Sequence, residues 1–399
     1  MKVALRSLVE IKSGYSPSTF NLIKSGTIPY VKVEDLNNCA KYQNESREYC
    51  EDVSRSVPAG SIIFPKRGAA IMNNKVRIAA TAICMDTNMM AIIPNGKTQS
   101  EFLYYAILYE KLSRIADTST IPQINNKHIS PYKILLPPLP EQKAIADLLS
   151  TWDEAIEKTE RLIQAKERRF KWLLHSLVCG QCSLDNEKSY WKKVKLGEVC
   201  KVITSNVDKK TTPGEKLVRL CNYMDVYKNY YITSDLDFMV ASATLNEIDK
   251  YQLKVNDVLL TKDSETPEDI ANSACVLEAS ENLLCGYHLT ILRPEKQLFG
   301  PYLNFVLHAS RIRYAFSRQA NGATRFGLSL SAYDMIEIPL PPIEKQRQIA
   351  ETLSSAQQEI DLLKQLSVKY KTQKRGLMQK LLTGEWRVKP EVVYQYKEV

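Results

Sequence analysis

Residues that could do chemistry are present, but their spacing does not make a catalytic site. The four histidines are too dispersed to indicate a metal site or a general-base cluster: His128, His175, His288 and His308. One CxxC spacing occurs, from Cys179 to Cys182, without the second CxxC or the histidine pair that a zinc site needs. We therefore expect no catalytic residue and no metal in this chain.

One cofactor-binding motif is present only in incomplete form, and the motifs of an adenine methyltransferase are missing. Residues 93–98, Ile-Pro-Asn-Gly-Lys-Thr, resemble the end of a phosphate-binding loop, but Ala91 stands where that motif requires glycine and Pro94 lies inside the loop. An adenine methyltransferase would need Asn or Asp before Pro-Pro and an aromatic residue, together with a glycine-rich cofactor loop. Here both Pro-Pro pairs follow leucine. The sequence favours a binding protein over an enzyme.

Basic and amide side chains gather in loops in both halves of the chain. Arg and Lys suit phosphates and guanine edges, and Asn and Gln suit adenine edges. An ordinary solvated loop is the alternative for any single residue. We predict that these clusters contact DNA: Lys66, Arg67, Asn73, Lys75, Arg77, Gln123, Asn125 and Lys127 in the first half, and Lys262, Ser264, Arg318, Asn321 and Arg325 in the second.

Length and charge agree with a nucleic-acid partner without requiring one. A chain of 399 residues exceeds what one hydrophobic core usually supports, so we expect two domains with connectors. Its 44% hydrophobic and 25% charged residues are typical of globular proteins. The 54 Lys and Arg against 45 Asp and Glu give a formal charge of +9, which attracts polyanions. A mildly basic soluble protein is the alternative reading of that charge.

The cysteines and the first residues indicate a compartment. Nine cysteines are scattered through the chain, and residues 1–6 show no long apolar region of a secretory signal. No apolar stretch approaches the roughly 20 residues of a membrane-spanning helix. We expect a soluble protein of the reducing cytoplasm.

The most informative feature of the sequence is an internal duplication. Residues 136–149, LPPLPEQKAIADLL, match residues 340–353, LPPIEKQRQIAETL. The displacement from 136 to 340 is 204 residues, and it returns between residues 173–180 and 377–384. A segment that keeps its length this strictly is typical of a packed helix rather than of a loop.

Each copy predicts one long helix that starts after a Pro-Pro pair and stops at Gly180 or Gly384. Apolar residues recur by threes and fours, as in a heptad seam with polar interruptions at Thr159, Lys166, Ser367 and Lys374. The predicted helix-helix residues are Ile145, Leu149, Trp152, Ile156, Ile163, Phe170 and Leu177 in the first copy, and Ile349, Leu353, Ile360, Leu363, Tyr370 and Leu381 in the second. We expect the two helices to pair as an antiparallel coiled coil with pseudo-twofold symmetry.

The regions before the helices share a layout more than a sequence. Residues 3–5 resemble 194–196, residues 28–33 resemble 216–220, and residues 57–68 lie over 253–264. Short Val and Ile runs bounded by Gly, Pro and Asn predict a curved sheet, and the apolar segments 101–109 and 301–309 predict helices. The fold class is α+β, with two similar domains that each precede a long helix.

The two-copy order and the Leu-Pro-Pro start with its following glutamine resemble the specificity subunit of type I restriction-modification enzymes. The resemblance covers nearly the whole chain. It departs at Gly60-Ser61 and Asn256-Asp257, where each copy keeps half of the usual Gly-Asp pair. It implies a first target-recognition domain at 1–136, a first conserved helical spacer at 137–180, a second target-recognition domain at 181–340, a second spacer at 341–384, and a C-terminal tail at 385–399.

The same resemblance implies a function and partners. Each domain would read one half of a split double-stranded DNA target, and the spacers would dock two modification (methyltransferase) subunits and the restriction (endonuclease and translocase) subunits. S-adenosylmethionine, and ATP with Mg for restriction, would be bound by those partners. Two alternatives stay open: a coiled-coil adaptor whose ends bind protein, and a self-contained nuclease or methyltransferase, which would need a cluster of perturbed carboxylates in one cleft.

Overall fold

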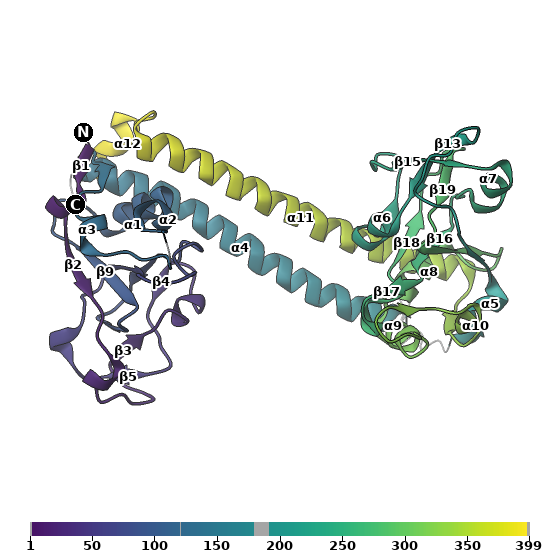
Figure 1. Ribbon diagram of the computed structural model, residues 1–399, viewed down its shortest axis with the longest axis horizontal. Coiled ribbons are helices and arrows are strands. Elements are labelled where there is room, and N and C mark those ends of the chain that lie inside the picture. Colours follow the sequence, from purple (N-terminus) through teal and green to yellow (C-terminus); the bar gives the residue numbers. More distant parts are fainter. Residues whose placement is uncertain (1, 120, 179–190, 397–399) are drawn as a thin grey trace. The chain divides into compact units, whose positions relative to one another are not determined.

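The computed structural model describes residues 2–119, 121–178 and 191–396, which fall into two compact units (Figure 1). The first unit comprises Met1–Glu160 with Gln365–Val399, and the second comprises Arg161–Lys364. Each unit therefore holds one predicted domain and parts of both long helices. The CxxC at 179–182 and the predicted stop at Gly180 lie outside the described residues.

The first domain is built on three small sheets. A five-stranded sheet has the order β2 (Val9–Ser13), β9 (Met89–Pro94), β6 (Ile62–Pro65), β7 (Arg77–Ala79) and β4 (Tyr42–Gln43). A three-stranded sheet has the order β5 (Tyr49–Cys50), β3 (Ile28–Val31) and β8 (Cys84–Met85), and β1 (Lys2–Ala4) pairs with β10 (Lys133–Leu135). The helices are α1 (Ser100–Glu110), α2 (Leu112–Ile115) and α3 (Asn126–Ile129), with 3₁₀ turns at Leu5–Ser7, Pro17–Thr19, Asp35–Asn37 and Val53–Arg55.

The second domain repeats this topology. Its five-stranded sheet has the order β12 (Cys200–Thr204), β20 (Leu289–Pro294), β16 (Val258–Thr261), β18 (Ser273–Val276) and β14 (Tyr231–Ile232). The smaller sheets are β15 (Met239–Ala243), β13 (Lys216–Cys221) and β19 (Leu283–Cys285); β11 (Lys192–Lys195) with β22 (Glu337–Leu340); and β17 (Asp263–Ser264) with β21 (Phe326–Gly327). The helices are α5 (Leu196–Val199), α6 (Tyr223–Lys228), α7 (Leu245–Tyr251), α8 (Gly300–His308), α9 (Ser310–Ser317) and α10 (Leu330–Asp334), with a 3₁₀ turn at Pro267–Asp269.

Strand register confirms the predicted duplication. In the first domain Ile62 pairs with Ile92 and Pro65 with Met89; in the second domain Val258 pairs with Leu292 and Thr261 with Leu289. The central strands β6 and β16 are buried at all four positions, as their apolar runs predict. The predicted helices at 101–109 and 301–309 are α1 and α8. The shared layout of the two sequences is therefore a shared fold.

The incomplete Gly-Asp pairs have a physical explanation. Gly60 and Asn256 occupy the same turn before the central strand, with φ of 83° and 78°. Glycine reaches this left-handed region without strain, and asparagine is among the residues that tolerate it best. Asp257 accepts hydrogen bonds from Arg293 Nε and Nη2 at 2.8 Å each, whereas Ser61 Oγ donates to the carbonyl of Pro58 at 2.6 Å. Each copy thus closes the turn with its own side chains.

The two long helices are α4 (Leu139–Val178) and α11 (Ile343–Thr383), followed by the short α12 (Pro390–Tyr394). Both long helices begin directly after the predicted Pro-Pro pair, with starts displaced by the same 204 residues, from 139 to 343. The chain leaves α11 at Gly384, which has a φ of 77°. Left-handed glycine is the usual way to end a helix, so the predicted stop at Gly384 is confirmed.

Each long helix has a buried glutamine near its start, and the hydrogen bonds of its amide explain why this residue occurs in both copies. Gln142 Oε1 accepts from the backbone N–H of Gln99 at 2.9 Å, and its Nε2 donates to the carbonyls of Pro137 and Lys97. In the second unit Gln346 makes the same three bonds, to the N–H of Phe299 and the carbonyls of Pro341 and Gln297. Each glutamine therefore joins the start of its long helix to the loop before α1 or α8.

Within each unit, side chains connect α4 to α11. In the first unit Glu160 pairs with Lys371 at 2.6 Å, and Asp153 pairs with Lys374. Because the partner number rises on α11 as it falls on α4, the two helices run in opposite directions there. In the second unit Lys166 pairs with Glu359 at 2.6 Å. The polar seam positions Lys166 and Lys374 are thus paired across the helices.

The described seam residues predicted for helix pairing are all buried or half-buried. Ile145, Leu149 and Leu381 join the core of the first domain, and Phe170, Ile349 and Leu353 join that of the second. Each domain core is therefore completed by the helix that follows it and by the far end of the other helix. A coiled coil in the strict sense, the pseudo-twofold symmetry, and the domain boundaries proposed from the sequence stay predictions.

Alanine substitutions at two glycines, one inside α11 and one directly after it, are expected to change the free energy of unfolding in opposite directions. A Cβ on Gly384 would lie 2.7 Å from Leu135 Cδ2 at a left-handed φ, so Gly384→Ala should lower the free energy of unfolding by about 1–2 kcal/mol. A Cβ on Gly376, inside the helix, meets nothing within 4 Å, so Gly376→Ala should raise it by about 0.5–1 kcal/mol. Urea unfolding of the two variants checks both signs, and equal shifts would contradict this account of the helix end.

Two general expectations from the sequence can be compared with the described residues. No helix among them is long and apolar enough to cross a membrane. Seven cysteines lie in the described part of the chain, and each is a thiol rather than half of a disulfide. Burial raises the pKa of the Cys200 thiol to about 12, so this cysteine is unreactive as a nucleophile.

Candidate nucleic-acid interface

One structural feature recurs at the end of the central strand in both domains. In the first domain the N–H of Lys66 donates to the carbonyl of Asn88 at 2.7 Å, and the N–H of Ile124 donates to the carbonyl of Lys66 at 2.9 Å. Arg67 and Gln123 form a backbone bridge beside them. We call these three segments, residues 66–67, 88 and 122–124, the strand-end junction of the first domain.

The second domain builds the same junction from residues 262–263, 288 and 326–328. The N–H of Lys262 donates to the carbonyl of His288 at 3.1 Å, and the N–H of Leu328 donates to the carbonyl of Lys262 at 2.9 Å. Asp263 pairs with Gly327, as Arg67 pairs with Gln123. The strand-end junctions thus share a backbone and differ in their side chains.

The lysine that begins each junction is half-buried. Burial lowers the pKa of Lys66, and the neighbouring Arg67 lowers it further. Burial likewise lowers the pKa of Lys262, whose Nζ donates to the carbonyl of Ser205 at 3.0 Å. An anion beside either lysine would stabilise its charge more than it stabilises a fully solvated cation, because electrostatic interactions are stronger in a partly desolvated site.

Several predicted contact residues of the first domain meet at its junction. Lys66, Arg67 and Gln123 belong to it, with Arg67 exposed. Asn125 follows at once and caps α3 together with His128, and the exposed Lys127 lies on that helix. These residues form one polar surface from two segments about 55 positions apart in the sequence.

The other three predicted residues of the first domain lie elsewhere. Asn73 is exposed in the loop before β7, and Lys75 Nζ donates to Asn37 Oδ1 at 2.5 Å. The Arg77 guanidinium donates to the carbonyls of Cys39, Val76 and Leu36. Because its guanidinium donates to backbone carbonyls, we expect Arg77 to stabilise the fold, and its contact with DNA stays a prediction.

The predicted contact residues of the second domain also fall into those at the junction and those elsewhere. Lys262 belongs to the junction, and the exposed Arg325 lies 3.9 Å from Asp263. Asn321 is exposed and its backbone bonds to Gly327, while Arg318 is exposed at the end of α9. Ser264 is only 5% exposed, and its hydroxyl donates to the carbonyl of Thr266. This burial favours a role of Ser264 in the fold, and its contact with DNA stays a prediction.

Three polar junction residues are not among the contacts predicted from the sequence: Asn88, Asp263 and His288. The 204-residue displacement that aligns the helices does not align them, because Arg67 corresponds to Asp263 and Asn88 to His288 at smaller offsets. Only strand register makes these pairs visible. His288 Nδ1 lies 2.6 Å from Asp263 Oδ2. The positions of the histidines in the sequence do not predict this interaction.

Comparison with known proteins identifies the family. The model of the type I restriction modification DNA specificity domain matches residues 1–167 and 188–370. A putative type I restriction enzyme MjaX specificity subunit of Methanocaldococcus jannaschii is 25% identical over 94% of this chain and 86% of its own length. The type I restriction enzyme EcoBI specificity subunit of Escherichia coli is 22% identical over 88% of this chain and 77% of its own length.

A solved structure supports the fold. The crystal structure of the type I restriction-modification system S subunit from M. genitalium has a TM-score of 0.60 at 18% identity and covers 96% of both chains. The family match covers well over half of the sequence and both copies of the duplicated fold. This chain belongs to the type I restriction modification DNA specificity domain family, as its twice-repeated helix start predicts.

Proposed function

We propose that this chain is the DNA sequence-reading subunit of a type I restriction-modification complex and that each domain reads one half of a split target. One observation carries the proposal: two domains share a backbone down to the hydrogen bonds of the strand-end junction, yet carry different polar side chains there. Phosphate contacts position a protein on DNA, and side chains at base edges supply specificity. Two differently decorated copies suit two different half-sites.

The catalytic steps belong to partner subunits in this proposal. Among residues 2–119, 121–178 and 191–396 no group of His, Cys, Asp and Glu is placed to hold a metal ion. In the proposed complex, the modification subunits bind S-adenosylmethionine for methylation, and the restriction subunits bind ATP with Mg. The chain itself acts without catalysis, in the cytoplasm, where its DNA target is found.

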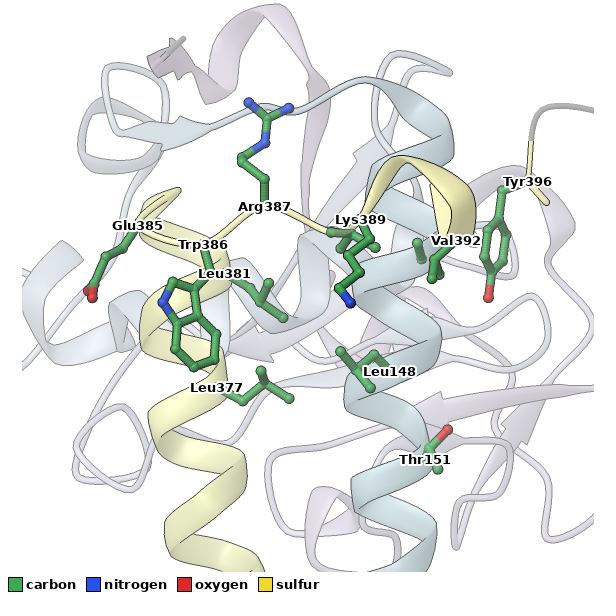
Figure 2. A pocket seen from close by; sticks show the side chains of 12 residues that line it. Leu148, Thr151, Leu377, Leu381, Glu385, Trp386, Arg387, Lys389, Val392 and Tyr396 are labelled. Carbon is green, nitrogen blue, oxygen red and sulfur yellow. The ribbon is translucent and has the colours of Figure 1, made fainter. Parts of the chain in front are cut away.

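The spacers offer two partly corresponding grooves for the modification subunits. In the first unit a groove of about 650 Å³ lies between α4, α11 and the C-terminal tail, and Figure 2 shows Leu148 and Thr151 of α4 beside Leu377 and Leu381 of α11. In the second unit a groove of about 270 Å³ is lined by Leu173, Thr352 and Ser355, among others. The repeat places Leu173 on Leu377, Thr352 on Leu148 and Ser355 on Thr151.

Grooves that share these three repeated positions support two copies of one partner, because a duplicated surface can bind the same surface twice. The grooves are partly apolar, and apolar concave surfaces are typical of protein contacts. We assign one modification subunit to each groove. The restriction subunits would join the assembled complex.

Selection from a random pool of duplexes tests the proposed function. The complex of this chain with its modification subunit is incubated with the pool, and bound duplexes are sequenced over several rounds. The expected result is one motif with two specified parts separated by an unspecified gap of fixed length. An unenriched pool, or a motif equally enriched by the modification subunit without this chain, would contradict the proposal.

Two arginines of the first domain separate DNA contact from folding. Arg67→Ala should lower affinity for the target about tenfold or more and change the free energy of unfolding by less than about 0.5 kcal/mol, because Arg67 is exposed. Arg77→Ala should lower the free energy of unfolding by about 1–3 kcal/mol, because three carbonyls lose a donor. Gel-shift titration and urea unfolding of both variants give the comparison. The reverse pattern would overturn both assignments.

A further inference from the structure

The two strand-end junctions carry different side chains at equivalent backbone positions. Position 67 is Arg where position 263 is Asp, and position 88 is Asn where position 288 is His. Position 123 is Gln where position 327 is Gly, and both make the same backbone bridge. Since the backbone hydrogen bonds are the same in both domains, backbone pairing alone does not select these residues.

His288 is held in one orientation. Its Nδ1 lies 2.6 Å from Asp263 Oδ2. Its ring packs against Tyr287, with 3.7 Å between centroids, and meets Tyr223 edge-on at 6.5 Å. With Nδ1 engaged by the carboxylate, Nε2 is the ring nitrogen left to meet a ligand. Within the described residues, the hydrogen bond of the imidazole is the one between Nδ1 and Asp263.

The neighbours of His288 suit nucleic acid. Lys262 and Arg325 supply positive charge beside Asp263, and Lys209 Nζ lies 5.8 Å from the centroid of the Tyr287 ring. Tyr223 stacks on Tyr227 at 5.6 Å between centroids. An oriented ring nitrogen among cations can accept from the amino group of adenine or cytosine, or donate to guanine N7 or O6, all of which lie in the major groove.

We propose that His288, oriented by Asp263, contacts a base edge in the second half-site, and that Asn88 holds the equivalent position for the first half-site. This inference rests on the proposed function. Asp263 is a positioning residue in it, because its carboxylate acts through the imidazole. The two junctions are then the places where the two half-sites acquire different sequences.

Reciprocal substitutions test the inference without introducing a foreign residue. His288→Asn gives the second domain the residue that the first carries at the equivalent position, and Asn88→His does the reverse, so the shared backbone accommodates both. Gln373→His, at an exposed position of α11, is the matched control. Each variant is assembled with the modification subunit, and Kd is measured for the selected target and for duplexes in which one base pair at a time is replaced.

Each of the two substitutions is expected to change base discrimination in only one half-site. His288→Asn should lose about tenfold or more of the discrimination at one or two base pairs of one half-site and keep the other half-site intact. Asn88→His should do the same in the opposite half-site, and Gln373→His should change neither. Binding to unrelated duplexes should stay at the wild-type level in all three, since phosphate contacts are untouched.

The outcomes distinguish this inference from the proposed function. If the wild-type complex does not discriminate between duplexes, the proposed function fails and takes the inference with it. If the wild type discriminates and His288→Asn retains full discrimination at every base pair, the inference fails while the function stands. Weaker binding of His288→Asn to all duplexes alike would place His288 in the fold and also overturn the inference.

Discussion

Replacing Gln346 by alanine is expected to lower the free energy of unfolding of the second unit by about 2–4 kcal/mol. The side chain is fully buried and bonds to the N–H of Phe299 and to the carbonyls of Pro341 and Gln297. Removal of the amide leaves these backbone groups without partners and opens a cavity, and both effects destabilise. In a unit of about 200 residues this corresponds to a drop of about 5–15 °C in Tm.

Thermal unfolding followed by circular dichroism measures the effect, and the chain offers a matched control. Gln358 lies on the same helix with an exposed side chain, so Gln358→Ala should shift Tm by about 1–2 °C at most. Gln142→Ala should reproduce the large effect in the first unit, where the three hydrogen bonds recur. Equal shifts for Gln346→Ala and Gln358→Ala would show that the buried amide does not hold the helix start to its domain.

Replacing Leu148 by aspartate is expected to remove one modification subunit from the complex. Leu148 is 40% exposed on α4 and lines the groove of the first unit, so the substitution leaves the core unchanged and puts a carboxylate into the proposed contact. A buried charge without a partner costs several kcal/mol, so affinity at that groove should fall about 100-fold or more. The groove of the second unit should keep its partner.

Native mass spectrometry of the assembled complex counts the subunits. Leu162→Asp is the control, because Leu162 is 44% exposed on the same helix and lines neither groove. We expect one modification subunit with Leu148→Asp and two with Leu162→Asp. Two subunits bound to both variants with the wild-type Kd would remove the groove of the first unit from the proposed interface.

The sequence predicts the scaffold well because the scaffold is duplicated. Equal displacement between two Pro-Pro starts defines both long helices, and all the described apolar seam positions are buried or half-buried. The turn at Gly60 and Asn256 shows how one backbone accepts two sequences, since both residues tolerate a positive φ. Helix periodicity and turn chemistry are local, and a single sequence displays both.

The candidate interface is harder to predict because its members meet only through long-range strand pairing. Arg67 and Gln123 were both predicted, but His288 and Asp263 become partners only when β16 and β20 are paired in register. The polar types of Arg77 and Ser264 predict contact with solvent or DNA, whereas the hydrogen bonds that the structure shows for their side chains go to backbone carbonyls. Residue type indicates what a side chain can bind, and only packing decides whether it faces solvent.

Mapping of adenine methylation tests the central claim most directly. A plasmid is recovered from cells that express the modification subunit with this chain, without this chain, or with its Leu148→Asp variant. The methylated adenines of the plasmid are then sequenced. We predict methylation at one split motif with a fixed gap, present only when this chain is present. A methylation pattern that is unchanged by removal of the chain would contradict the account and favour an adaptor that binds protein.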